Sequence, residues 1–334
     1  MANLVIKPEQ VMINPINPDI ITKIQASNFF EKIIHNCESK FSNIKVIENS
    51  SGRFLVFDNF AQSGIIKNKL YNGNVPYINY FLISCLLNPN IKNILMLGMG
   101  TGRIANCFEE LIPDLERFDI VDIDKKVLSV SQKYFGFKED SKIKVHIQDA
   151  TDFVKNTKTK YDVVILDIGN SNGVYFAFHT EEFLGKLSDL LNENGILISN
   201  VISSYNFNSD ENVLFKSTLK TYRNVFNDVM IIPTIYGDHL FHKIFFDLEE
   251  EVMDVISALL FSSKTKISVS KEELENKAKE LQQKSNIQDI EKLDKFVGDL
   301  LTEEINTDKF KSFRNEHINN PELNSDNLKS YFAV

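Results

Sequence analysis

Hydrophobic positions in the middle of the chain fall into two alternating patterns. Short, almost continuously apolar runs are separated by stretches whose apolar residues recur every three or four positions. Short runs of this kind are typical of buried strands, and the stretches between them of amphipathic helices. Regular alternation of strands and helices favours a parallel sheet. The predicted strands are 94–97, 117–121, 143–147, 162–167 and 196–201, and the helices include 104–111, 126–135, 180–191 and 213–222.

The region before this alternation predicts a small antiparallel sheet. Two strand-like runs, 44–47 and 53–57, flank Asn49-Ser50-Ser51-Gly52, which is typical of a hairpin turn, and a third run covers 61–66. A helix is predicted after Asp19, with apolar positions that continue to Ile33 and Ile34. Tyr77–Leu87 predicts a strongly apolar helix that ends at Asn88-Pro89-Asn90.

The pattern changes again towards the C-terminus. Residues 229–233 and 242–246 predict an antiparallel pair of strands, and 252–260 an amphipathic helix. Ser270-Lys271-Glu272-Glu273 has capping-box spacing and opens a charged helical region that extends to about Ile305. We therefore expect three parts: residues 1–70 with a helix and a small sheet, a Rossmann-like nucleoside-binding domain over 71–248, and a helical C-terminal appendage over 249–334. The fold class is α/β, with a doubly wound, mostly parallel sheet.

A glycine-rich loop follows the first strand of the alternation. Gly98-Met99-Gly100-Thr101-Gly102 places glycines at alternate positions directly before a helical pattern. Glycine lets the backbone turn tightly and lets a ligand approach without a Cβ in the way. A strand that ends in this way indicates a nucleotide-type site at the carboxyl edge of a parallel sheet.

Aspartates end the next strands in order. Asp122 ends the second strand, Asp149 follows the third, and Asp167 ends the fourth. The carboxyl ends of parallel strands lie side by side, so these side chains should surround one ligand. Asp122 could accept both ribose hydroxyls and Asp149 an adenine amino group. Asp124 is better explained as a helix N-cap.

Other readings of the loop are weaker. Glycine after a strand can be turn chemistry alone, but the ordered set of loop and aspartates favours a nucleoside site. The wider G-x-G-x-x-G spacing of dinucleotide-binding loops is missing. No Gly-Lys-Ser or Gly-Lys-Thr follows, which excludes a Walker-type phosphate loop.

Composition narrows the class of protein. The 334 residues are 43% hydrophobic and 25% charged, as in an ordinary globular protein. A formal net charge of −9 argues against nucleic acid or an anionic membrane as the main partner. Three scattered cysteines favour a reducing compartment and suggest no metal cluster, and His239 and His242 lack a third ligand. With no apolar run long enough for a membrane span, we expect a cytoplasmic protein.

Several stretches together resemble the spermidine synthase (polyamine aminopropyltransferase) family, which shares its core with class I S-adenosylmethionine-dependent methyltransferases. The resemblance runs from about Val46 to Phe246. It rests on Arg53-Phe54-Leu55-Val56-Phe57-Asp58 with Gln62-Ser63-Gly64, Val121-Asp122-Ile123-Asp124, Gln148-Asp149-Ala150, Tyr161–Asp167, and His179-Thr180-Glu181-Glu182-Phe183 with Asn194-Gly195. The Thr-Glu-Glu-Phe element is rare in generic methyltransferases.

The resemblance implies a donor site for S-adenosylmethionine or its decarboxylated form, with no metal, and Ile123 packed on the adenine face. It also implies a role in polyamine biosynthesis with a small-molecule amine acceptor. The implied cofactor-binding residues are Gln62, Gly98, Met99, Gly100, Thr101, Gly102, Asp122, Ile123, Asp149, Ala150 and Asp167.

The amine-handling positions depart from the family pattern. Thr101 stands where the family has the aspartate that holds the cationic aminopropyl group, and Asn170 where it has the catalytic aspartate. The family's Tyr-His-Glu element has no clean counterpart near Tyr71-Asn72-Gly73. An amide cannot take a proton at neutral pH, so another base or another reaction is required. Asp167 and Tyr77 are the candidates, although a ribose-side ligand and a core aromatic residue explain them more simply.

Three functions follow as hypotheses. The first is an aminopropyltransferase-like transferase that acts on an amine by direct displacement. The second is a methyltransferase on the same scaffold, which Thr101 and Asn170 favour. The third is a catalytically inactive nucleoside-binding protein that acts through its charged 270–305 region. That region is most simply a solvated helical face, but it could also dock a partner or the second subunit of a homodimer.

Overall fold

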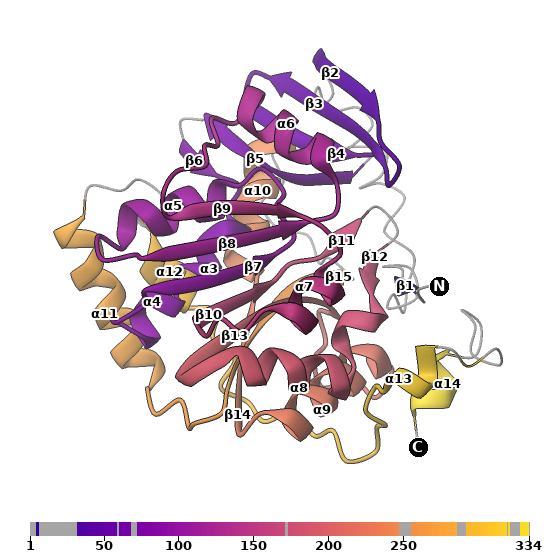
Figure 1. Ribbon diagram of the computed structural model, residues 1–334. Helices are drawn as coiled ribbons and strands as arrows, with labels where there is room; N and C mark the ends of the chain where they lie inside the picture. Colours follow the sequence, from indigo (N-terminus) through magenta and orange to yellow (C-terminus); the bar gives the residue numbers. More distant parts are fainter. Residues whose placement is uncertain are drawn as a thin grey trace.

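The computed structural model describes residues 5–6, 32–58, 60–67, 72–170, 173–246, 255–285, 292–318, 320 and 328–333. These residues form an α/β fold with a seven-stranded central sheet, a five-stranded antiparallel sheet and a small three-stranded sheet. Figure 1 shows the five-stranded sheet, in indigo, next to one edge of the central sheet. The predicted fold class is confirmed.

The central sheet has the strand order β14-β15-β13-β10-β7-β8-β9. All pairs within β13-β10-β7-β8-β9 are parallel, whereas β15 pairs antiparallel with both β13 and β14. The chain order reverses between β7 and β10, and ligands of doubly wound sheets bind at such a switch point. The bounds are β7 Asn93–Leu97, β8 Arg117–Asp122, β9 Ile143–Ile147, β10 Tyr161–Leu166, β13 Leu191–Ser204, β14 Asp228–Pro233 and β15 Val255–Ser263.

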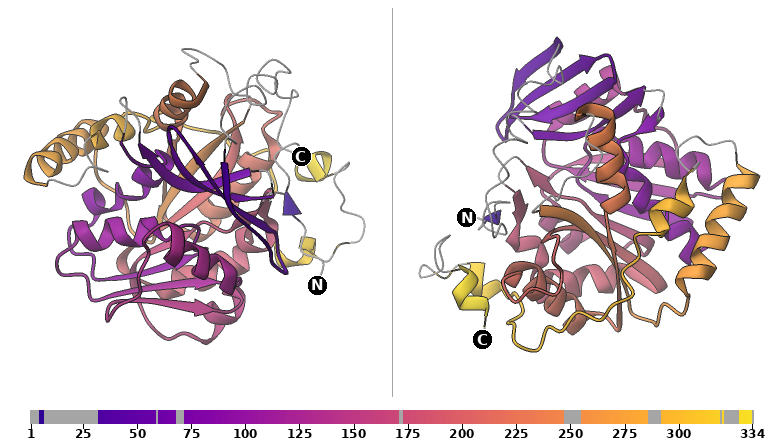
Figure 2. Two further views of the ribbon diagram at one scale, coloured as in Figure 1. Left: turned by 90° about the horizontal axis from the view of Figure 1, so that it is seen from above. Right: turned by 180° about the vertical axis from the view of Figure 1, so that it is seen from behind.

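Helices cover both faces of this sheet (Figures 1 and 2). Successive residues of one strand belong to different cores: Ile94 and Met96 to one, Leu95 and Leu97 to the other. A strand buried on both faces has no polar alternation, which explains its continuous apolar run. The helices are α5 Arg103–Leu111, α6 Lys125–Tyr134, α7 Ala150–Asn156, α8 Glu181–Leu190, α9 Val213–Val225 and α10 Ile235–Phe246.

The predicted N-terminal hairpin is confirmed. The side-chain oxygen of Asn49 accepts the backbone N–H groups of Ser51 and Gly52 and closes its turn. Ile33 and Ile34, however, lie in a strand instead of the predicted helix, because β2 continues the ladder of this sheet. The rest of that predicted helix lies outside the described residues. The strands are β2 Lys32–Glu38, β3 Asn43–Asn49, β4 Gly52–Phe57, β5 Phe60–Lys67 and β6 Asn72–Asn74.

The helix predicted over residues 77–87 is divided in two. α3 covers Tyr77–Phe81 and α4 covers Ser84–Leu87. Between them, the N–H groups of Leu82 and Ile83 bond to carbonyls three residues back, and this tighter hydrogen bonding separates the helices.

Two predictions in the C-terminal third are wrong. Residues 242–246, predicted as a strand, form the end of α10. The described part of 252–260, predicted as a helix, belongs to β15 and is buried between β13 and β14. A short apolar run has no periodicity that separates a buried strand from a buried helix, so pairing partners decided the outcome. The division into domains at 70/71 and 248/249 stays a prediction.

Helices do follow β15. α11 Lys271–Lys284 begins with the predicted capping box, in which Ser270 and Glu273 bond each other's backbone N–H. α12 Leu293–Val297, α13 Asn315–Ile318 and α14 Leu328–Phe332 complete this end. The small third sheet joins β1 Val5–Ile6 to the hairpin of β11 Gly169–Asn170 and β12 Gly173–Tyr175, which leads into a 3₁₀ turn at Phe176–His179.

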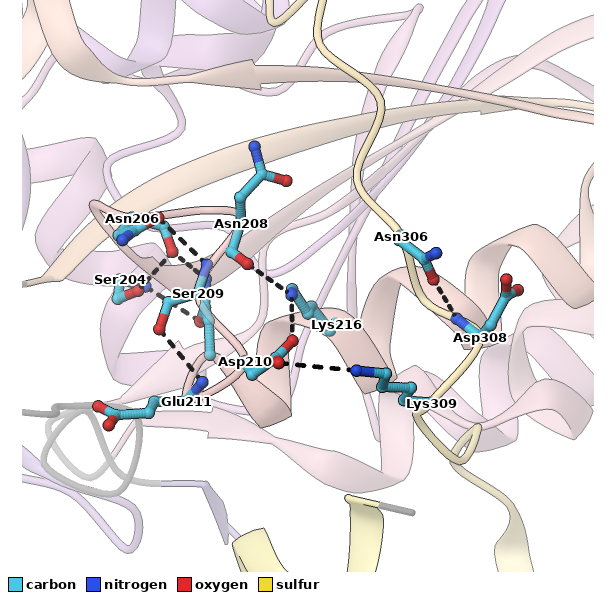
Figure 3. A network of polar contacts seen from close by, with 11 residues as sticks. Ser204, Asn206, Asn208, Ser209, Asp210, Glu211, Lys216, Asn306, Asp308 and Lys309 are labelled. Carbon is cyan, nitrogen blue, oxygen red and sulfur yellow. Dashed lines mark hydrogen bonds and ion pairs between the residues drawn. The ribbon is translucent and has the colours of Figure 1, made fainter.

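A buried lysine organises the loop after β13. The Lys216 ammonium donates to the backbone oxygen of Asn208 at 2.8 Å and lies 3.4 Å from a carboxylate oxygen of Asp210 (Figure 3). The other oxygen of Asp210 lies 3.9 Å from the Lys309 ammonium, in the C-terminal segment. The carboxyl end of β13 is therefore joined to residues far along the chain.

Candidate functional site

The glycines of the loop after β7 have different physical roles. Gly98 has φ +93°, and a Cβ there would lie 2.3 Å from the backbone oxygen of Asp167. Gly102 has φ +70°, and its Cβ would meet the Phe137 ring at 2.4 Å. Gly100, at φ +52°, has no neighbour nearer than the Ser63 Cβ at 3.8 Å. Gly98 and Gly102 are thus required by packing, whereas Gly100 leaves room for a ligand.

Asp122 at the end of β8 holds this loop in place. One carboxylate oxygen accepts the Met99 N–H at 3.0 Å, and the other accepts the Asp124 N–H at 2.8 Å. Burial raises the pKa of Asp122 to about 6, against the lowering effect of these two bonds. Each oxygen has a second lone pair, so the carboxylate could still accept ribose hydroxyls.

Ile123 presents an apolar surface beside Asp122. The residue is 45% exposed, and few large hydrophobic residues in the described part of the chain are exposed to this extent. A flat aromatic base could cover it. This agrees with the predicted adenine contact, which stays a prediction.

Asp149 is the N-cap of α7. One oxygen, Oδ1, accepts the Thr151 N–H at 2.7 Å and the Asp152 N–H at 3.4 Å. The following Ala150 is buried. An interaction with an adenine amino group would therefore fall to the other oxygen, Oδ2. The sequence did not indicate this capping role.

Asp167 lies just beyond β10 and bonds to two side chains. Oδ2 accepts the Tyr77 hydroxyl at 3.2 Å, and Oδ1 accepts the Asn200 side-chain amide at 3.0 Å. Burial raises the pKa of Asp167, and the two donors oppose this. The pKa of Tyr77 lies well above its usual value, mainly because the residue is buried and also because Asp167 is negatively charged. Tyr77 therefore stays protonated and donates its hydrogen bond to Asp167. The sequence did not indicate the role of Asn200, which follows the apolar run 196–198 within β13.

Thr101 is bonded within the protein. It is 1% exposed, and its hydroxyl lies 2.8 Å from that of Ser63 on β5. Ser63 also lies near Tyr77, where it slightly lowers the pKa of the Tyr77 hydroxyl against the larger effect of burial. Ser63 therefore lies between Tyr77 and the glycine loop. The Gln62-Ser63-Gly64 motif does not by itself indicate this role of Ser63. Its neighbour Gln62 is half-buried.

Asn170 lies in the hairpin after Asp167. Its backbone pairs with Gly173 in β12, and β12 pairs in turn with β1. The side chain of Asn170 lies outside the described part of the structure, so its predicted catalytic position stays a prediction.

Among the residues that the structure describes, no three His, Cys, Asp or Glu side chains are grouped so as to hold a metal ion. Within the same residues, no helix has the length and apolar character needed to cross a membrane.

Comparison with known proteins places most of this site within one matched region. The family model for the spermine/spermidine synthase domain matches residues 82–248, which include the glycine loop, Asp122, Asp149 and Asp167. The chain is 32% identical over 208 residues to a polyamine aminopropyltransferase of Vibrio vulnificus, covering 59% of this chain and 66% of the relative. It is 30% identical over 202 residues to one of Saccharolobus solfataricus, covering 58% and 65%. The matched part thus spans less than two thirds of the length of these curated relatives.

Solved structures show the same fold. A probable spermidine synthase from Corynebacterium glutamicum superposes with a TM-score of 0.58 at 17% identity, covering 82% of this chain and 97% of that one. A spermidine synthase in complex with the transition state analogue AdoDATO superposes with a TM-score of 0.55 at 20% identity, covering 71% and 75%.

Proposed function

The chain belongs to the spermine/spermidine synthase family, and we propose that it is a transferase that moves an aminopropyl or related group from a sulfonium donor to a small amine. The donor is decarboxylated S-adenosylmethionine or S-adenosylmethionine. One observation carries the proposal: the glycine loop lies between two of the predicted aspartates at the switch point of the sheet. Its Met99 N–H bonds to Asp122, and its Gly98 packs against the backbone of Asp167.

The described residues fit the nucleoside part of such a donor. The open space beside Gly100 lets a ligand approach the backbone. Asp122 accepts the ribose hydroxyls, the exposed Ile123 packs against the base, and Asp149 accepts the adenine amino group. These residues lie at or just after the carboxyl ends of three neighbouring strands, β7, β8 and β9, so binding orients the donor relative to the whole edge.

The transfer is a displacement at the carbon beside the sulfonium. The amine nitrogen forms the new bond to that carbon, the carbon–sulfur bond breaks, and sulfur leaves as a neutral thioether. The attacking amine must lose a proton to the protein or to water. Asp167 serves as the base, because its raised pKa favours taking that proton. Tyr77 stays protonated and orients the carboxylate.

Calorimetry on the full chain tests donor binding. S-adenosylmethionine, its decarboxylated form and methylthioadenosine are titrated separately, and a panel of aliphatic diamines is then assayed for aminopropyl addition by mass spectrometry. Preference for the decarboxylated donor with a mass increase on a diamine supports the proposal. Preference for the carboxylated donor with methyl addition would instead indicate a methyltransferase, and no binding of any of the three would contradict both.

A pair of substitutions tests the base. Asp167→Asn should lower kcat about 100-fold or more, because general base catalysis contributes roughly that much. Asn170→Asp should raise kcat and partly restore activity in Asp167→Asn, since it supplies a second carboxylate three residues away. Asn170→Ser is the matched control and should do neither. Unchanged kcat in Asp167→Asn would exclude Asp167 as the base.

A further inference from the structure

A carboxylate outside the matched family region contacts the helix that carries Tyr77. We propose that Asp299 is a positioning residue for the transfer reaction: it fixes α3 so that the Tyr77 hydroxyl lies against Asp167. The inference rests on the proposed function, and it concerns residues on both sides of the matched range 82–248. Figure 1 shows α12, which precedes Asp299, next to α3.

One oxygen of Asp299 joins two helices. Oδ2 accepts the hydroxyl of Tyr80 on α3 and the backbone N–H of Tyr236 on α10, the latter at 2.7 Å. The Tyr80 oxygen accepts the Gly237 N–H at 2.9 Å. The first-turn N–H groups of a helix have no partner within the helix, so α10 is stabilised at this end by Asp299 and Tyr80.

Aromatic rings pack closely around this junction. Tyr80 is fully buried, and its ring lies edge-on to Phe296 of α12 at 4.9 Å between centroids. Tyr236 contacts the same Phe296 ring at 5.2 Å. A Cβ on Gly237 would lie 2.9 Å from the Tyr80 ring, so the two helices approach closely only with glycine here.

The position of α3 depends on such contacts. α3 has only five residues, and no side chain caps its N-terminus. A helix this short has little stability of its own, so its neighbours determine where it lies. Tyr77 and Tyr80 are one turn apart on it, bonded at one end to Asp167 and at the other to Asp299.

The bond at the Tyr77 end is sensitive to displacement. Its 3.2 Å exceeds the usual 2.5–3.0 Å range of bonds between hydroxyl and oxygen. A small shift of α3 would therefore break it. Without the contacts of Asp299, we expect Tyr77 to lose its bond and Asp167 to lose its orientation.

A neighbouring carboxylate provides the matched control. Asp238 accepts the Thr234 hydroxyl at 2.7 Å, a bond that stays at the start of α10. Burial raises the pKa of both acids, to about 7 for Asp238 and about 6 for Asp299. Asp238→Ala thus removes a similar buried carboxyl group in the same region without removing the bond to Tyr80.

The kinetic test uses the full chain and one double variant. Asp299→Ala should lower kcat on the order of tenfold, with KM for the donor within about twofold, because misplacing a catalytic pair mainly slows chemistry. Asp299→Asn should retain activity, since an amide oxygen can accept both bonds. Asp238→Ala should stay within about twofold of the parent, because the bonds from Tyr80 and Tyr236 to Asp299 remain. In a Tyr77→Phe background, Asp299→Ala should cost no further kcat; a full additional loss would overturn the proposal.

A measurement without substrate separates this inference from the proposed function. Fluorotyrosine placed at position 77 reports its hydroxyl environment by ¹⁹F NMR. Its resonance should move in Asp299→Ala and in Tyr80→Phe, which keeps the ring and the packing, and should not move in Asp238→Ala. An unchanged resonance in either Asp299→Ala or Tyr80→Phe would overturn the positioning role. If the wild-type chain transfers no group, the proposed function fails. The ¹⁹F measurement would still show whether Asp299 positions the Tyr77 hydroxyl.

Discussion

Asp122 combines two tasks in one carboxylate. Its two oxygens hold the glycine loop and the turn after β8, and they are also the proposed ribose acceptors. Substitution of Asp122 should therefore weaken donor binding even if the protein still folds. The position of Asp122 was read from the sequence, but its bond to the Met99 N–H was not.

Removing this carboxylate should abolish most donor affinity. Asp122→Ala is expected to weaken binding at least about 100-fold, since two charge-assisted hydrogen bonds contribute roughly 1.5–3 kcal/mol each. The measurement is calorimetry with the tightest of the three donor compounds. Asp124→Asn, which keeps the α6 cap through its side-chain oxygen, is the control and should bind normally. Equal affinity in Asp122→Ala would place the ribose elsewhere.

Asp238 should make stability depend on pH in a definite direction. Because burial raises its pKa to about 7, the folded state holds this proton more tightly than the unfolded state. Its contribution to the free energy of unfolding is full at acidic pH and is lost as the pH rises through about 7.

Asp238→Asn should therefore stabilise the protein by about 1–3 kcal/mol at pH 8 and leave it almost unchanged at pH 4. Urea unfolding at the two pH values measures this difference. The exposed Asp114→Asn is the control and should show little change at either pH. An equal effect of Asp238→Asn at both values would contradict the assignment.

At the scale of elements, the glycine loop and α5 depend on a close ring contact. Gly102 precedes α5 in a left-handed conformation, directly against Phe137. Gly136 has nearly the same φ, +72°, but no atom within 4 Å of its would-be Cβ. Substitutions at the two glycines therefore distinguish the cost of backbone strain from the cost of a clash with Phe137.

Gly102→Ala should lower the free energy of unfolding by about 3 kcal/mol, the sum of strain and overpacking. Gly136→Ala carries the strain alone and should cost about 1 kcal/mol. Thermal or urea unfolding of both variants gives the comparison. If the two variants lost equal stability, contact with Phe137 would not be what requires glycine at position 102.

At the scale of the whole molecule, the C-terminal segment completes the central sheet. β15 lies between β13 and β14 and pairs with both along most of its length. The matched family region ends at residue 248, before this strand. The same segment supplies Asp299 to α3 and Lys309 to the loop after β13.

A chain truncated after Leu248 should not unfold cooperatively. It would lose β15, leave β13 with an open apolar edge and remove the partner of β14. Circular dichroism during heating and light scattering would report a broad transition and aggregation. A chain truncated after Ile318 keeps β15, α11 and α12 and should retain a sharp transition. A sharp transition in the shorter chain would show that 249–334 is a separable appendage.

The sequence by itself determined the elements whose signals are local. Glycines that need positive φ, the Asn49 turn, the capping box at Ser270 and the apolar runs of β7 to β10 each fix nearby backbone through short-range sterics and hydrogen bonds. Because parallel strands end at one edge, the strand order also placed Asp122, Asp149 and Asp167 together.

Only the tertiary structure decided what depends on distant partners. Residues 255–263 became a strand because β13 and β14 offered unpaired edges, and 242–246 became helix as the continuation of α10. The links of Tyr77 to Asp167 and of Tyr80 to Asp299 join residues 90 and 219 positions apart. No local pattern encodes such pairs, because their bonds form only once burial of the whole core has brought the helices and strands together.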